Sequence, residues 1–229
     1  MFRSLLLAAM LLVSTSASPM GAVGAQDDFP ELKTCKLSPT GRNEYFILEP
    51  GYQLQLEGGG EKLHITVLDE TKVVAGVTTR VVEEREWKGD KLYEVSRNYF
   101  AICPESRNVY YFGEHVEFYD DKGKVTKTDG TWIAGENGNR PGLIMPGKPQ
   151  AKMKYFQEVA PGVAMDHATI ESLDETCTVP AGTFKRCLKV REGSSIEVWA
   201  KEYKYHAPGV GLIQDEDLKL VKHGFINKK

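Results

Sequence analysis

KLHITVLDETKVVAGVTTRVVEEREW, residues 62–87, is the stretch that decides the fold class. Over residues 62–70, Leu63, Ile65 and Val67 alternate with polar neighbours, and this period of two is typical of a half-buried β-strand. Residues 73–87 are rich in Val and Thr, residue types that favour strands because they pack well on a pleated surface. We therefore predict two consecutive strands here.

The same pattern recurs along the rest of the chain. Turn signals separate the runs, at Lys88-Gly89-Asp90 and at residues 120–123, and such signals favour antiparallel hairpins. The glycine- and proline-rich segment GENGNRPGLIMPGKPQ, 135–150, is expected to be a long loop within one β-rich domain over residues 26–229. We predict the remaining strands over residues 92–102, 108–119, 124–134, 154–159, 165–173, 184–191, 196–205 and 212–214.

These runs predict an all-β fold, a large antiparallel meander. The segment AMDHATIESLDE (164–175) has apolar residues at helix-like spacing, but its Thr-Ile content and its turn-rich flanks favour a strand. A large sheet without helices over its apolar face is expected to curve into a barrel, a half-barrel or a sandwich. The concave interior of such a sheet is the expected place for a ligand.

The N-terminus has the features of a secretory signal peptide. Arg3 precedes the apolar run LLLAAMLLV (5–13), and Val23-Gly24-Ala25 supplies the small residues of a cleavage site. The run is shorter than the roughly 20 residues that a membrane-spanning helix needs, and no second long apolar run follows. We therefore expect cleavage near Ala25 and an exported protein, periplasmic or extracellular, that is soluble and has no transmembrane segment.

Charge and composition argue against several partners. The formal net charge is −3, and Lys and Arg are scattered among Asp and Glu, so the basic stripe that binds nucleic acid or an anionic membrane is missing. No nucleic-acid partner is expected. No cofactor motif is found, and no cofactor is expected.

Four cysteines, Cys35, Cys103, Cys177 and Cys187, predict a disulfide framework, because an exported chain with an even number of cysteines typically pairs them. Between the last two lies VPAGTF, and a reversal of the chain at Gly182 would place them opposite each other. We predict the pairs Cys177–Cys187 and Cys35–Cys103. Metal ligation is the alternative, but no second Cys or His lies at metal-ligand spacing.

Few residues are candidates for metal binding or catalysis. His115 and Glu117 share a strand face and could bind a metal ion, although exposed strands produce such pairs by chance. His167 and Glu171 form a second weak pair, with Asp166 on the opposite face. Neither pair has a partner nucleophile, because no Gly-x-Ser-x-Gly motif is present. A carboxylate pair for glycoside hydrolysis stays open, since the 32 acidic residues offer many combinations.

Aromatic residues are spread over most of the predicted strands. Trp199, Tyr203 and Tyr205 would share one strand face, and with Trp132 and Tyr111 they are the candidates for an aromatic-lined site that binds an apolar or amphipathic ligand. The alternative is that these rings fill the core.

Six segments carry a resemblance to known proteins: NEYFILEPGYQLQLEG (43–58), TVLDETKVVAGVTTRVVEEREW (66–87), NVYYFGE (108–114), PGLIMPGKP (141–149), VPAGTFKRCLKV (179–190) and EYKYHAPGVGLIQDED (202–217). Together they resemble a family of uncharacterised exported bacterial β-rich proteins, over most of the chain, residues 35–221. The resemblance supplies no catalytic residue. The pattern YHAPGVGL (205–212) is also similar to one in periplasmic proteins, some with the open-barrel shape of lipoprotein carriers.

Three functional hypotheses follow. The first is a non-enzymatic protein of the bacterial envelope that binds a lipid or another apolar, envelope-derived molecule in the concave interior of the sheet. The second is a hydrolase or metal-dependent enzyme whose site is built from dispersed residues. The third is a purely structural or interaction protein without a pocket. For the enzyme, the residues to test are His115, Asp166, His167 and Glu171.

Overall fold

The computed structural model describes residues 29–196, 199 and 201–226, and within them the fold is almost entirely β. The one helix of the described residues is the short 3-10 helix η1 (Pro30–Lys33). None of the described helices is long and apolar enough to cross a membrane. The expected all-β fold is confirmed, whereas the predicted signal peptide, residues 1–25, lies outside the described residues.

The strands follow one another with short turns, as the hairpin signals predicted. They are β1 (Gly41–Asn43), β2 (Phe46–Leu48), β3 (Tyr52–Gly58), β4 (Glu61–Val74), β5 (Val77–Lys88), β6 (Lys91–Ile102), β7 (Val109–Tyr119), β8 (Val125–Lys127), β9 (Trp132–Ile133), β10 (Arg140–Met145), β11 (Lys154–Phe156), β12 (Glu158–Val159), β13 (Asp166–Val179), β14 (Gly182–Ser194), β15 (Lys201–Ala207), β16 (Gly211–Asp215) and β17 (Leu218–Phe225).

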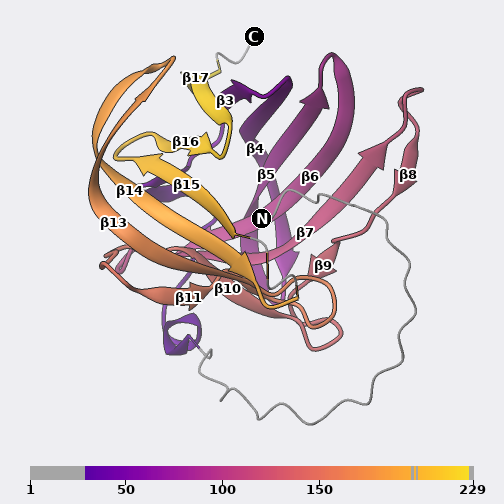
Figure 1. The fold of residues 1–229 in the computed structure, drawn as a ribbon. Coiled ribbons are helices and arrows are strands. Elements are labelled where there is room, and N and C mark those ends of the chain that lie inside the picture. The colour runs from indigo at the N-terminus through magenta and orange to yellow at the C-terminus, as the bar shows by residue number, and fades with distance from the viewer. Residues whose placement is uncertain (1–28, 197–198, 200, 227–229) are drawn as a thin grey trace.

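Two antiparallel meanders make up the main sheet. One runs from β3 to β7 and the other from β13 to β17, and β17 pairs with β3 to join them. Figure 1 shows the two meanders facing each other, the first in purple and magenta and the second in orange and yellow. The sheet therefore curves round until its two ends approach each other.

One short segment brings these ends together. At one end of the sheet, β11 pairs with β13 through Tyr155↔Ala168; at the other end, β12 pairs with β10 through Val159↔Arg140. Only Gln157 separates β11 from β12, so a single stretch of chain contacts both edges. Of the three shapes expected for the sheet, the result is a nearly closed barrel.

The segment expected to be a long loop, residues 135–150, contains a strand instead. β10 pairs with β7 through Leu143↔Tyr110 and with β12. Gly142 makes the pairing possible, because a Cβ there would lie 2.3 Å from the backbone C and O of Gln157. The glycine that suggested a loop is needed for close packing of backbone against backbone.

The two strands that join the meanders, β3 and β17, were not predicted. In β3, Tyr52, Leu54 and Leu56 are buried and alternate with polar residues, and in β17 Leu218 and Leu220 are buried. Both strands carry the period of two that identified the other strands, and the pattern is short in each.

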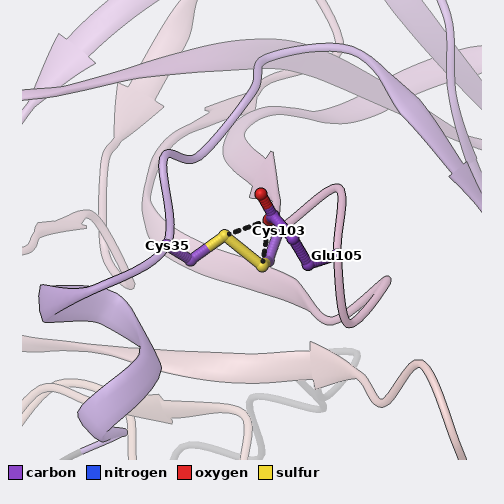
Figure 2. Close-up of side chains that lie close together, drawn as sticks. All are labelled: Cys35, Cys103 and Glu105. Carbon is purple, nitrogen blue, oxygen red and sulfur yellow. Dashed lines mark hydrogen bonds between the residues drawn. A yellow bond between two sulfur atoms is a disulfide. The ribbon is translucent and has the colours of Figure 1, made fainter.

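The predicted disulfide between Cys35 and Cys103 is confirmed. It joins the segment after η1 to the end of β6. Figure 2 shows the side chain of Glu105 against it, with Oε2 2.9 Å from Sγ of Cys35 and 3.1 Å from Sγ of Cys103. The sulfur atoms of a disulfide carry no proton, so this carboxylate would accept a hydrogen bond only from the reduced thiols.

The predicted disulfide between Cys177 and Cys187 is absent, and both residues are buried thiols. The hairpin turns at Pro180-Ala181 instead of at Gly182, with Val179 opposite Gly182, so Cys177 pairs with Phe184. A shift of register then places Cys187 opposite Glu175. Burial and a hydrogen bond with Cys187 raise the pKa of the Cys177 thiol to about 12, so Cys177 does not have the low pKa of a reactive cysteine.

Candidate functional site

The interior of the barrel contains a cavity of about 230 Å³. Its volume is close to the lower end of the roughly 300–1,000 Å³ that is usual for small-molecule sites. Aliphatic side chains from both meanders line much of it, together with six aromatic residues, Tyr45, Phe46, Tyr52, Phe100, Phe118 and Tyr155.

The cavity opens to the surface on one side. Asp129, Val163 and Ile196 line it and are exposed to solvent. All three lie in connections between strands, so the loops that carry them form the mouth.

Acidic residues enter the cavity because of strand alternation. On β5 the inward residues are Val82, Glu84 and Glu86, and they lie opposite apolar residues of β4, with Ile65↔Glu84 and Leu63↔Glu86. On the other side, Glu86 lies opposite Glu94 of β6. One wall of the cavity is therefore apolar in one strand and acidic in the next.

A buried ion pair stands in the opposite wall. Lys204 Nζ on β15 lies 2.8 Å from Glu192 Oε2 on β14 and 3.7 Å from Asp215 Oδ2 on β16. Gln157 Nε2 donates to Glu192 Oε1 at 2.7 Å. Burial by itself would raise the pKa of Glu192, but the charge of Lys204 outweighs it and holds that pKa at about 2. Burial lowers the pKa of Lys204, yet the carboxylates of Asp215 and Glu192 keep it well above its usual value.

Four other interior carboxyl groups, those of Glu84, Glu94, Glu114 and Glu158, have raised pKa values. Burial raises the pKa of Glu84 to about 7 and the pKa values of Glu94 and Glu114 to about 8. Burial also raises the pKa of Glu158 well above its usual value, and the nearby charges of Glu114 and Asp166 add to the effect. Glu84, Glu94 and Glu114 therefore titrate near neutral pH, where ordinary carboxylates are fully ionised.

Two carboxylate oxygens in the cavity wall have no hydrogen-bond partner among the described residues. They are Oε2 of Glu158 and Oδ1 of Asp215, in side chains that belong to residues only 2% and 4% exposed. A buried acceptor without a partner is destabilising. It marks a position at which a ligand or a water molecule could donate a hydrogen bond to the acceptor.

None of the five aromatic residues predicted to bind a ligand lines the cavity. Trp199 is exposed, and Tyr203 and Tyr205 lie on the outer face of β15, because the alternate residues Lys204 and His206 point inward. The predicted sharing of a face by Tyr203 and Tyr205 is correct, but that face is the outer one, where Lys189 Nζ lies 4.7 Å and 5.6 Å from the two ring centroids.

The other two aromatic candidates are core residues. Tyr111 and Trp132 are almost fully buried, with ring centroids 5.1 Å apart in an edge-to-face arrangement. Tyr111 donates its hydroxyl to Asn98 Oδ1 at 2.7 Å. These rings fill the space between strands, as the alternative interpretation held.

Neither candidate metal pair belongs to a group of three potential ligands among the described residues. His115 Nε2 and Glu117 Oε1 are 3.6 Å apart on the half-exposed outer face of β7. Glu171 is instead bound by Arg191 Nε at 2.6 Å. His167 lies beside Phe156 outside the cavity, whereas Asp166 lines it, so the residues proposed for an enzyme do not converge.

Among the described residues, one group of three potential metal ligands lies close together, Cys35, Cys103 and Glu105. The two sulfur atoms are joined in the disulfide, and a metal-binding cysteine must be a thiolate. The oxidised protein therefore has no metal site there.

The acidic residues that line the interior were not predicted from the sequence. The alternation Val82-Glu83-Glu84-Arg85-Glu86 could have revealed them, since every second residue faces inward. Both faces of this stretch carry charge, however, so the pattern does not say which one is buried.

Comparison of the chain with protein-family models, with curated proteins and with solved structures finds no match. The function must therefore be argued from the cavity itself.

Proposed function

We propose that this protein binds a small apolar or amphipathic molecule in the interior of the barrel. The observation that carries the proposal is the cavity of about 230 Å³ with an open mouth and a largely hydrocarbon lining. Burial of apolar surface contributes roughly 25 cal/mol per Å², so a short hydrocarbon chain would gain free energy on entering. No arrangement of the described residues favours an enzyme over a binding protein.

A titration with octan-1-ol tests this proposal. The uncharged chain should bind saturably at one site, and ¹⁵N-NMR shifts should map to inward residues such as Ile65, Val82 and Val190. Ala164→Phe, at the half-buried edge of the mouth, should weaken binding about tenfold or more by narrowing the entrance, as a core position does not accept extra volume easily. Thr183→Phe is the matched control, because Thr183 is exposed on the distant β13–β14 turn. Absence of saturable binding would contradict the proposal.

Export to the bacterial envelope is part of the same proposal. The signal-peptide features of residues 1–25 support it, and the Cys35–Cys103 disulfide fits an oxidising compartment. The resemblance to exported bacterial proteins points the same way. N-terminal sequencing of the protein from a periplasmic or culture fraction should begin at Gln26; recovery of the uncut chain from the cytoplasm would contradict export.

A further inference from the structure

The charge of the cavity wall is strongly one-sided. Nine carboxyl groups line it, with Lys204 and His206 as the basic residues. Lys204 is already paired with Glu192 and Asp215. Burial lowers the pKa of His206 to about 4, so this imidazole is neutral at ordinary pH. The wall therefore has many more acceptors for a cation than cations of its own.

The geometry of the acidic groups points to an organic cation. Among the described residues, no three carboxyl groups have oxygens within 4.8 Å of one another, whereas Ca²⁺ needs six to eight converging oxygen ligands. The carboxyl groups are instead distributed between apolar side chains, such as Val116 beside Glu114 on the inner face of β7. An ammonium group on a hydrocarbon chain matches both surfaces.

An observation that does not depend on the charge count also indicates that the cavity wall lacks a hydrogen-bond donor. Glu158 Oε2 is buried, faces the cavity and has no hydrogen-bond partner, and Glu114 and Asp166 lie close enough to Glu158 to raise its pKa. An ammonium group carries three N–H donors, enough to reach more than one of these carboxyl groups.

We propose that the ligand of the cavity is a small amphipathic amine, with its ammonium group at Glu158 and the neighbouring Glu114 and its hydrocarbon part against the apolar wall. This inference rests on the proposed function, since it requires that the cavity binds a ligand at all. The amine supplies a donor for the unpartnered Oε2 of Glu158, and its charge offsets the mutual repulsion of the carboxylates.

Binding of an amine should depend on pH. Among the described residues, the titratable groups that act on Glu114 are Glu84 on β5, Glu94 on β6, Tyr111 on β7, Glu158 on β12 and Asp166 on β13. As pH rises through about 8, Glu114 loses its proton while an alkyl ammonium group, like that of lysine with a pKa of about 10.4, keeps its charge. The affinity for the amine should therefore increase toward pH 9.

Three compounds with one chain length test the inference by isothermal titration calorimetry at pH 6 and pH 9. Octylamine should bind about tenfold or more tightly than octan-1-ol at pH 9, as expected for hydrogen bonds to charged groups, and the ratio should shrink at pH 6. Octanoate should bind most weakly. If octan-1-ol or octanoate binds as tightly as octylamine, the inference fails and the proposed function stands. If none of the three binds, both fail.

Charge-neutralising variants locate the ammonium group. Glu114→Gln and Glu158→Gln should each lower the affinity for octylamine at pH 9 about tenfold and leave the affinity for octan-1-ol unchanged, which shows that the cavity is intact. Glu117→Gln is the matched control on the outer face of β7 and should change neither. An equal loss of octylamine and octan-1-ol binding in the variants, or no loss at all, would overturn the assignment.

Discussion

At the scale of single residues, Lys204 is a buried cation held between two buried carboxylates. It is 7% exposed, and its partners Glu192 and Asp215 are 3% and 4% exposed. Removing a charge from water is costly, and the attraction of a partner offsets that penalty only while both partners remain. The ion pair therefore fixes the relative positions of β14, β15 and β16.

Lys204→Met should reduce the free energy of unfolding by about 3–5 kcal/mol, because it removes the positive charge of Lys204 from between the buried carboxylates of Glu192 and Asp215. Urea denaturation at pH 7 measures the change. Lys201→Met, at an exposed position of the same strand, should stay within about 0.5 kcal/mol of the original protein. Adding Glu192→Gln to Lys204→Met should recover part of the loss; equal stability of the Lys204 and Lys201 variants would contradict this role.

The four cysteines should divide into one disulfide and two thiols. Alkylation in denaturant without a reducing agent should label Cys177 and Cys187 and leave Cys35 and Cys103 joined. Peptide mass spectrometry reads this pattern directly. A peptide that links Cys177 to Cys187 would instead support the pairing that the sequence predicts.

At the scale of elements, the closure of the barrel depends on backbone contact between β10 and the segment around Gln157. A Cβ at residue 142 would lie 2.6 Å from the backbone nitrogen of Glu158 as well as against Gln157. Because backbone atoms cannot rotate away as a side chain can, a larger residue must push the two strands apart.

Gly142→Ala should therefore reduce the free energy of unfolding by about 1–3 kcal/mol, the usual effect of overpacking. Hydrogen exchange should show faster exchange at the amides of β11 and β12, with little change in β4 and β5. Lys154→Ala, exposed on β11, is the control. Unchanged exchange around Gln157 in the glycine variant would mean that closure does not depend on this contact.

At the scale of the whole molecule, the barrel holds many carboxyl groups inside one low-dielectric interior, and its stability should follow their titration. The raised pKa values of Glu84, Glu94 and Glu114 exceed the value of about 4.3 in an unfolded chain. Between these values the folded state holds protons that the unfolded state has lost, so stability falls as pH rises. The contribution of Glu192 to the pH dependence of stability has the opposite sign, since its pKa is held at about 2.

Stability should therefore be highest near about pH 5 and decrease as the pH rises toward 8 or falls toward 2. Urea denaturation at a series of pH values measures this profile. Glu114→Gln removes one of the raised carboxyl groups and should flatten the decrease between pH 5 and 8, whereas the exposed Glu117→Gln should not. A stability that rises from pH 5 to 8 would contradict the protonated interior.

The sequence predicted most of the strands because local alternation identifies each one separately, as in Leu63, Ile65 and Val67. The prediction from sequence was wrong where the structure depends on a contact between residues that are far apart in the chain. Gly142 signals a loop when it is considered alone, and a strand once Gln157 lies beside it. The aromatic candidates failed for a related reason: alternation groups Tyr203 with Tyr205 but does not say whether that face or the face of Lys204 is buried.

The sequence by itself therefore determined an all-β meander, its turns and one disulfide, since these depend on residues near one another or on a few cysteines. The tertiary structure decided that β17 pairs with β3, that residues 154–159 close the barrel, and that acidic residues line its interior. The physical reason is that a strand has two faces of similar local pattern, and only curvature of the complete sheet selects which of them is removed from water.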